Sequence, residues 1–197
     1  MNVIRLRDLL DEEVYGGSAN GAWLMAQLVE RTSTTSACNP VLLDFAGVEV
    51  VTTSFLRTSV MAFKSYSQEQ GLALVVGNLK PQVEEELDYL LRQVGEAIAS
   101  CRLSPKSNRT SKVQMLGIVE AKEADALKAV ASHDESVSAK SVAVYHGDDV
   151  TGGKRFTRWN NSLAALVRKG LLLETTNGRT KLYRPILKGL EHGSWVS

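Results

Sequence analysis

The stretch FTRWNNSLAALVRKGLLLETTNGRTKLY, residues 156–183, determines how the second half of this chain is expected to fold. Trp159, Leu163 and Leu166 are spaced as residues on one side of a helix. Gly170, behind a pair of basic residues, is typical of a helix end. Three leucines then begin a strand, TTNG contains an Asn-Gly turn pair, and Thr180 to Tyr183 returns. The stretch therefore predicts a helix followed directly by a β-hairpin.

Two shorter helices are expected before this one. The segment MLGIVEAKEADALKAVASHDESVSAKSVAVYHG, residues 115–147, has two apolar faces separated by a polar turn, and the second helix is expected from Ser138 to Tyr145. A polar loop of about nine residues follows, and Thr157 is the expected N-cap of the third helix. The second half thus reads as three helices and a hairpin.

The charge of the chain is divided between its halves. Residues 1–103 contain 8 Lys/Arg and 13 Asp/Glu, a net charge of −5, whereas residues 104–197 contain 15 and 9, a net charge of +6. Residues 147–188 alone contain nine basic and three acidic side chains, again +6. Such an asymmetry favours a polyanionic partner for the second half.

In the first half, strands and helices are expected to alternate. Residues 3–6, 40–51 and 72–78 read as strands, and helices are expected from Ser18 and over about residues 54–68. The unbroken apolar run LALVV favours a strand with both faces covered. This alternation predicts an α/β layer with at least one parallel pair of strands.

The segment PQVEEELDYLLRQVGEAIASC, residues 81–101, reads as one long helix. Apolar residues recur along it at helical spacing, and Pro81 and three glutamates suit its first turn. Such a helix would be about 31 Å long, more than one small sheet needs. Its end is therefore expected to pack against the second half or against another subunit in a homodimer.

The stretch PVLLDFAGVEVVTTSFL, residues 40–56, resembles STAS domains, and more closely the STAS-like domains found beside histidine-kinase-type ATPases. LALVVGNLKPQVEEELDYL continues the similarity, which covers roughly residues 1–100. The resemblance implies a STAS-like mixed sheet with helices and a partner of the kinase-like ATPase class.

In anti-sigma-antagonist members of that family, a serine at the start of a helix is phosphorylated within Asp-Ser-Ser-Gly. The matching residues here are Thr52, Thr53, Ser54 and Phe55, so the Asp and Gly are absent. The resemblance makes Thr53 the possible phosphoacceptor. The other explanation of this cluster is that Thr53 or Ser54 caps the helix.

LAALVRKGLL followed by NGRTKLYRPIL resembles the winged-helix-turn-helix domain, over about residues 113–190. The resemblance implies a small winged-helix α+β domain in which the third helix enters the major groove of double-stranded DNA. Arg158, Asn160 and Asn161 suit base edges, and basic side chains near them suit phosphates. The candidate DNA-binding residues are Lys154, Arg155, Thr157, Arg158, Asn160, Asn161, Arg179 and Lys181.

Several other classes of function are not supported by the sequence. The loop GDDVTGGK lacks the spacing of a phosphate-binding loop, and His133, His146 and His192 are scattered without metal-ligand spacing. Cys38 and Cys101 suggest neither a metal site nor a disulfide framework, and Asp44 reads as a turn carboxylate at a strand end. We therefore expect no enzyme, catalytic residue, cofactor or metal. No apolar run is long enough to span a membrane, and a cytoplasmic protein is expected.

The predicted organisation is a STAS-like α/β domain over residues 1–103, a linker at 104–112, a winged-helix domain over 113–190 and a tail at 191–197. Two functions follow from it. The first is a DNA-binding transcriptional regulator whose first domain receives a signal from a protein or small ligand. The second is a signalling adapter in which both domains bind proteins.

Overall fold

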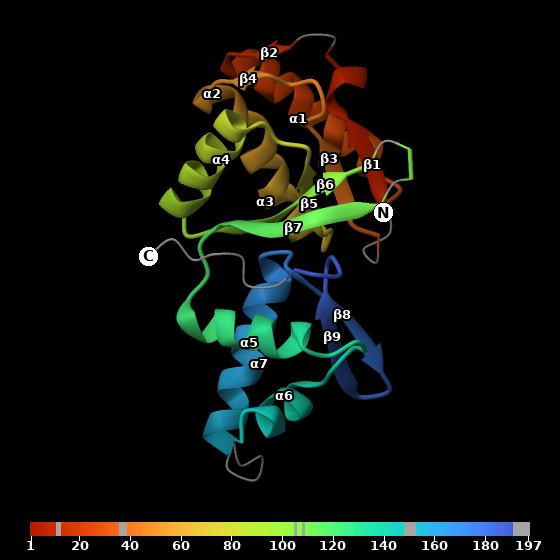
Figure 1. Ribbon diagram of the computed structural model, residues 1–197, viewed down its shortest axis with the longest axis vertical. Coiled ribbons are helices and arrows are strands. Elements are labelled where there is room, and N and C mark those ends of the chain that lie inside the picture. The colour runs from red at the N-terminus through yellow and green to blue at the C-terminus, as the bar shows by residue number, and fades with distance from the viewer. Residues whose placement is uncertain (11–12, 36–38, 105, 108, 148–152, 191–197) are drawn as a thin grey trace.

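Five strands form the central sheet, in the order β1–β3–β5–β6–β7 (Figure 1). The first four run parallel, and β7 is antiparallel to β6. Their bounds are β1 Asn2–Arg5, β3 Val41–Asp44, β5 Leu74–Gly77, β6 Ala97–Leu103 and β7 Thr110–Gly117. The protein is therefore a mixed α/β fold, and the expected parallel pairs are confirmed.

The computed structural model describes residues 1–10, 13–35, 39–104, 106–107, 109–147 and 153–190, and only the backbone of residues 153–156. The predicted tail, with His192, lies outside these residues, and so do Cys38 and the carboxylates Asp148 and Asp149 of the loop GDDVTGGK.

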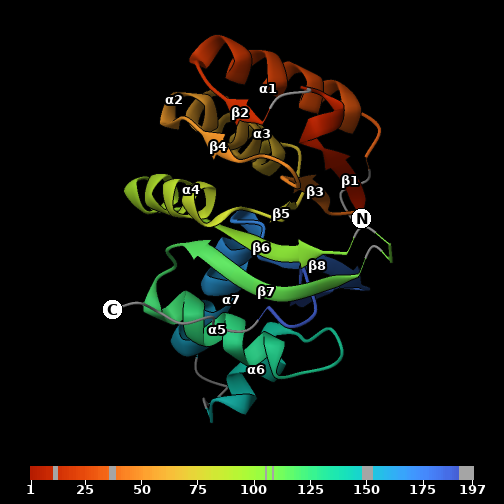
Figure 2. The same cartoon turned by 45° about the horizontal axis from the view of Figure 1, so that its top comes forward.

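Helices cover one face of this sheet (Figure 2). They are α1 Ser18–Thr32, a continuous helical segment made of α2 Thr53–Leu56, the π-helical turn η2 Arg57–Met61 and α3 Ala62–Glu69, and then α4 Pro81–Gln93. A short 3-10 turn, η1 Leu6–Asp8, follows β1, and β2 Val14–Tyr15 pairs in parallel with β4 Val50–Val51 beside the helices. We call residues 1–117 the sheet unit.

The remaining chain forms three helices and a hairpin, in the predicted order. The elements are α5 Ala121–Ala131, α6 Ala139–Tyr145, α7 Gly153–Arg168, β8 Leu172–Asn177 and β9 Thr180–Pro185. The unit they form covers the face of the sheet opposite α1–α4, and α6 lies at its end farthest from the sheet (Figures 1 and 2). We call residues 118–190 the helix–hairpin unit.

The alternation of side chains along the strands divides the core into two layers. Val76 and Leu43 pack with α1–α4, whereas their neighbours Val75 and Leu42 pack with the helix–hairpin unit. All four side chains are fully buried. Both faces of β3 and β5 are thus apolar because both are covered, as expected for a central parallel strand.

The predicted long helix over residues 81–101 is wrong. Helix α4 ends at Gln93, Gly95 adopts a φ of +69°, and residues from Ala97 onward form β6. Val94, which continues the apolar spacing of α4, is 61% exposed. Helices commonly end at a glycine with a positive φ. Here Gly95 ends α4, and the apolar residues Ile98 and Cys101 belong to a strand although they continue the helical spacing. The predicted packing of the helix end against the second half or against another subunit depended on that long helix, so α4 gives it no support.

The predicted linker at 104–112 is also wrong. Residues 104–109 connect β6 to β7, and Thr110–Gly117 form the fifth strand, so the sheet unit extends well beyond residue 103. The segment is polar because β7 lies at the edge of the sheet, where Ser111 and Lys112 are exposed. Charged and polar residues are common on edge strands because they discourage pairing with another chain.

Polar contacts also join the two units. The ammonium group of Lys64 on α3 lies 3.1 Å from Glu96 and donates to the carbonyl of Lys169, just after α7, at 3.1 Å. Lys169 in turn forms a 3.1 Å ion pair with Glu123 on α5. Burial lowers the pKa of Lys64, and the charge of Glu96 opposes that shift. The C-terminal end of α7 is thus held by a buried cation of the sheet unit.

No helix in the described residues is long and apolar enough to cross a membrane.

The packing of both sheet faces predicts one cooperative unfolding unit. Val75→Ala and Val76→Ala should each lower the free energy of unfolding by about 2 kcal/mol, because each removes buried methyl groups from one of the two core layers. Guanidinium unfolding followed by tryptophan fluorescence reports on both units, since Trp23 lies on α1 and Trp159 on α7. Both variants should shift the same single transition. Two separate transitions, each moved by only one variant, would show that the units unfold independently.

Candidate nucleic-acid interface

Helix α7 presents one buried and one exposed side. Trp159, Leu163 and Leu166 are buried against the other helices, as predicted from their spacing. Thr157, Arg158, Asn161, Ala164 and Arg168 are exposed on the opposite side. The helix begins at Gly153, so Thr157 lies within it and the predicted N-cap is wrong. Ser162, a polar residue of the same helix, is also buried.

The predicted base-reading residues differ in their accessibility. Arg158 and Asn161 are exposed, and Asn160 is partly buried. The guanidinium of Arg158 lies 5.4 Å from the ring centroid of Trp159 and 3.9 Å from the carboxylate of Asp125 on α5. Both Arg158 and Asp125 are more than half exposed, so this ion pair is weak and leaves the arginine available.

The hairpin carries the other predicted basic residues. Gly178 adopts a φ of +60° at the turn between Asn177 and Thr180, which suits an Asn-Gly pair. Arg179 is exposed beside this glycine, and Lys181 is exposed with its ammonium group 2.9 Å from Glu174. The hairpin runs beside α7 and away from the sheet (Figure 1).

Lys154 and Arg155 belong to the first turn of α7, but their side chains lie outside the described ones. The structure describes the other six predicted side chains. Thr157 is exposed and Asn160 is partly buried, and the exposed basic or amide side chains are those of Arg158, Asn161, Arg179 and Lys181. We call these four residues the basic surface.

Sequence reasoning missed two exposed arginines on the same unit. Arg168 lies seven residues after Asn161, which is two helical turns, so the helical spacing could have identified it. Arg184 follows the buried Tyr183 in β9, and the alternation of strand side chains could have identified it. Both arginines line a groove between the hairpin, α7 and the sheet unit.

Two of the scattered histidines lie in a row of aromatic rings at the end of α6. His133 contacts Tyr145 with centroids 5.5 Å apart, and His146 stacks on Trp159 at 4.5 Å. These contacts fix the end of α6 against α7. The described residues contain no group of three or more potential metal ligands.

In the sheet unit, Thr52 rather than Thr53 or Ser54 caps the helix that begins at α2. Its side-chain oxygen accepts a hydrogen bond from the backbone amide of Phe55 at 3.3 Å, which corrects the predicted cap. The hydroxyl of the half-buried Thr53 instead donates to the Glu86 carboxylate on α4. A phosphate on Thr53 would therefore meet a negative charge, and the two groups would repel one another.

Asp44 has the role of a turn carboxylate. One of its oxygens accepts from the amide of Ala46 at 3.0 Å and from the side chain of Asn78 at 2.8 Å. Burial, together with the charge of Asp44, raises the pKa of the nearby Cys101 thiol to about 11. Neither group has the accessibility or the partners of a catalytic nucleophile.

A scan against protein-family models finds no match to this chain, and a search of curated proteins finds no relative.

The contact between Thr53 and Glu86 makes a testable prediction. Thr53→Glu should lower the free energy of unfolding by about 1–2 kcal/mol, because it replaces a hydrogen bond with two facing carboxylates. Ser54→Glu is the matched control. Ser54 is exposed in the same helical turn, where a negative charge is tolerated, so its effect should stay within a few tenths of a kcal/mol. Thermal or urea unfolding measures both. Adding Glu86→Gln to Thr53→Glu should restore most of the loss, and no restoration would contradict the contact.

The raised pKa of Cys101 predicts an unreactive thiol. In a Cys38→Ser background at about pH 8, Cys101 should react with Ellman's reagent at least about 100-fold more slowly in the folded protein than after denaturation. Since folding raises this pKa from 9.0 to about 11, the contribution of the thiol to stability should be present below pH 9 and lost as the pH rises toward 11. Equal rates in folded and denatured protein would contradict the described burial.

Proposed function

We propose that this protein is a DNA-binding regulator that contacts duplex DNA through α7 and the β8–β9 hairpin. On this proposal the helix–hairpin unit is a winged-helix domain, α7 is its recognition helix and the hairpin is its wing. The order of three helices and a hairpin supports that assignment, and so does the position of Gly178 at the hairpin turn.

The observation that carries the proposal is the exposure of the basic surface. Arg158, Asn161, Arg179 and Lys181 all reach solvent although the opposite end of α7 is packed against the sheet. Arginine and asparagine at the start of a helix can read guanine and adenine in the major groove. Basic side chains on a hairpin beside that helix can contact the phosphates that flank the groove.

The sheet unit has a regulatory role in this proposal, as a STAS-like domain that receives a signal from a protein or a ligand. Its contact with the carbonyl of Lys169 reaches the end of the proposed recognition helix. A change in the sheet unit would therefore act on the orientation of α7.

A signalling adapter is the second candidate function. Val14 in β2 pairs with Val50 in β4, and the two side chains are 57% and 49% exposed. Strand β4 directly precedes the helix that contains Thr53. An exposed apolar pair of this kind suits contact with another protein, such as a kinase-like ATPase.

Fluorescence-anisotropy titration with mixed-sequence duplex DNA across a salt series tests the DNA-binding proposal. Protein binding releases cations that are condensed on the DNA phosphates, and this release is less favourable at higher salt concentration. The affinity for DNA should therefore fall steeply as the salt concentration rises. The Arg158→Ala/Arg179→Ala double variant should bind at least about tenfold more weakly and reduce the salt slope by roughly one to two.

The control is Arg31→Ala/Arg57→Ala, which removes two exposed arginines from α1 and η2 on the other side of the sheet. This pair should bind DNA as the unaltered protein does. Absence of binding at low salt, or an equal loss in the control, would overturn the proposal and favour the adapter.

A further inference from the structure

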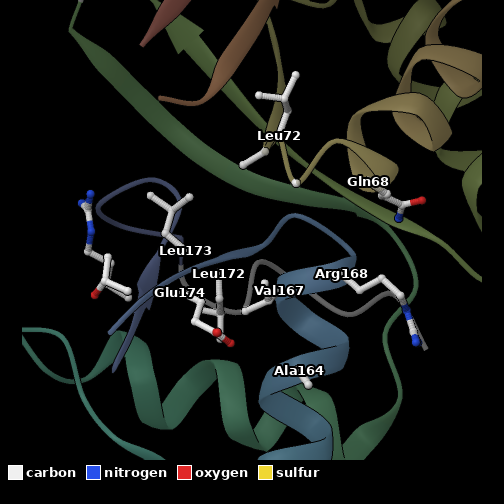
Figure 3. A pocket seen from close by; sticks show the side chains of 12 residues that line it. Gln68, Leu72, Ala164, Val167, Arg168, Leu172, Leu173 and Glu174 are labelled. Carbon is white, nitrogen blue, oxygen red and sulfur yellow. The ribbon is translucent and has the colours of Figure 1, made fainter. Parts of the chain in front are cut away.

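A groove lies where α7, the β8–β9 hairpin and the turn between α3 and β5 meet (Figure 3). Its volume is about 370 Å³. Residues from both units line it, including Gln68 and Leu72 of the sheet unit and Val167 and Leu173 of the helix–hairpin unit. Ligand sites of this size occur preferentially where two structural units meet.

The inner wall of the groove is apolar and well packed. Leu72, Leu172 and Leu173 line it, yet each is at most 8% exposed, so the core holds these side chains in place. Ala164 lies on the α7 wall (Figure 3), where its small, exposed side chain leaves room for a ligand. A preformed apolar wall favours a ligand with an apolar body.

Two arginines and one glutamate are the charged residues of the groove lining. Arg168 and Arg184 line it, and neither forms an ion pair with a carboxylate in the described part of the chain. Glu174, an acidic residue of the lining, is paired with Lys181 at 2.9 Å. The two arginines therefore remain available for an anionic group of a ligand.

We propose that this groove binds a small organic anion, a molecule with one carboxylate, sulfonate or phosphate group on an apolar body. Leu72, Val167 and Leu173 would contact the body, and one of the exposed arginines, Arg168 or Arg184, would pair with the anionic group. An inorganic anion alone would leave the apolar wall uncovered, and a neutral apolar molecule would leave the arginines unused. Because both units line the groove, such a ligand would favour their packed arrangement. The proposal does not depend on DNA binding.

The probe for the test is anilinonaphthalene sulfonate, an apolar ring system with one anionic group, and phenylnaphthylamine is its neutral counterpart. Fluorescence titration of the full chain should show saturable binding of the sulfonate at one site per chain. The neutral probe should bind about tenfold more weakly, because it cannot pair with the arginines.

Two variants locate the site. Arg168→Glu/Arg184→Glu should weaken sulfonate binding by about tenfold or more, and Ala164→Trp, which fills the groove from an exposed position, should abolish it. The control Arg31→Glu/Arg57→Glu reverses the charge of two exposed arginines outside the groove and should leave sulfonate binding unchanged. Circular dichroism and unfolding curves establish that each variant is folded.

The proposal is overturned if the sulfonate fails to bind at up to about 1 mM, or if it binds the groove variants and the control equally. It is also overturned if reversing Arg168 and Arg184 weakens DNA binding but not sulfonate binding, since the arginines would then belong to a nucleic-acid surface. Loss of sulfonate binding in a groove variant that binds DNA normally supports the groove independently of the proposed function.

Discussion

The whole arrangement depends on a sheet that is apolar on both faces. Three helical segments, α1, the continuous α2–η2–α3 segment and α4, cover one face. On the other face, β3, β5 and β6 would expose leucine, valine and alanine to water if the helix–hairpin unit were absent. Burying that second face is strongly favourable, because each buried aliphatic side chain contributes roughly 1.5–3 kcal/mol. The helix–hairpin unit is therefore better described as the second cover of the sheet than as a separate domain on a linker.

Directional contacts complement this apolar packing. A buried lysine is costly unless its charge and hydrogen bonds are satisfied, and Lys64 satisfies them with Glu96 and the Lys169 carbonyl. The negative end of the α7 dipole lies close to the same ammonium group. Apolar burial brings the two units together, and the directional contact from Lys64 to the Lys169 carbonyl favours one orientation over others.

The sequence allowed prediction of elements whose signals are local. Gly170 and the Asn-Gly pair indicated the end of α7 and the hairpin, and the apolar runs indicated β3 and β5. Strand β6 was missed because Val94, Ile98 and Cys101 continue the spacing of α4 across Gly95. Strand β7 was missed because its first residues, Thr110 to Lys112, are polar and resemble a loop in sequence.

The candidate sites divide in the same way. The exposed side of α7 follows from helical spacing and the hairpin from its Asn-Gly pair, so all four residues of the basic surface could be predicted. The contact between Thr53 and Glu86, and the groove with its leucine wall, join residues that are far apart in the chain. Only the packing of the units brings them together. One further consequence follows from α7 itself, which is anchored at its last turn and has its first turn far from the sheet. Its 16 residues span about 24 Å, so a tilt of the helix–hairpin unit by about 10° about this anchor would displace the far end of α7 by roughly 4 Å.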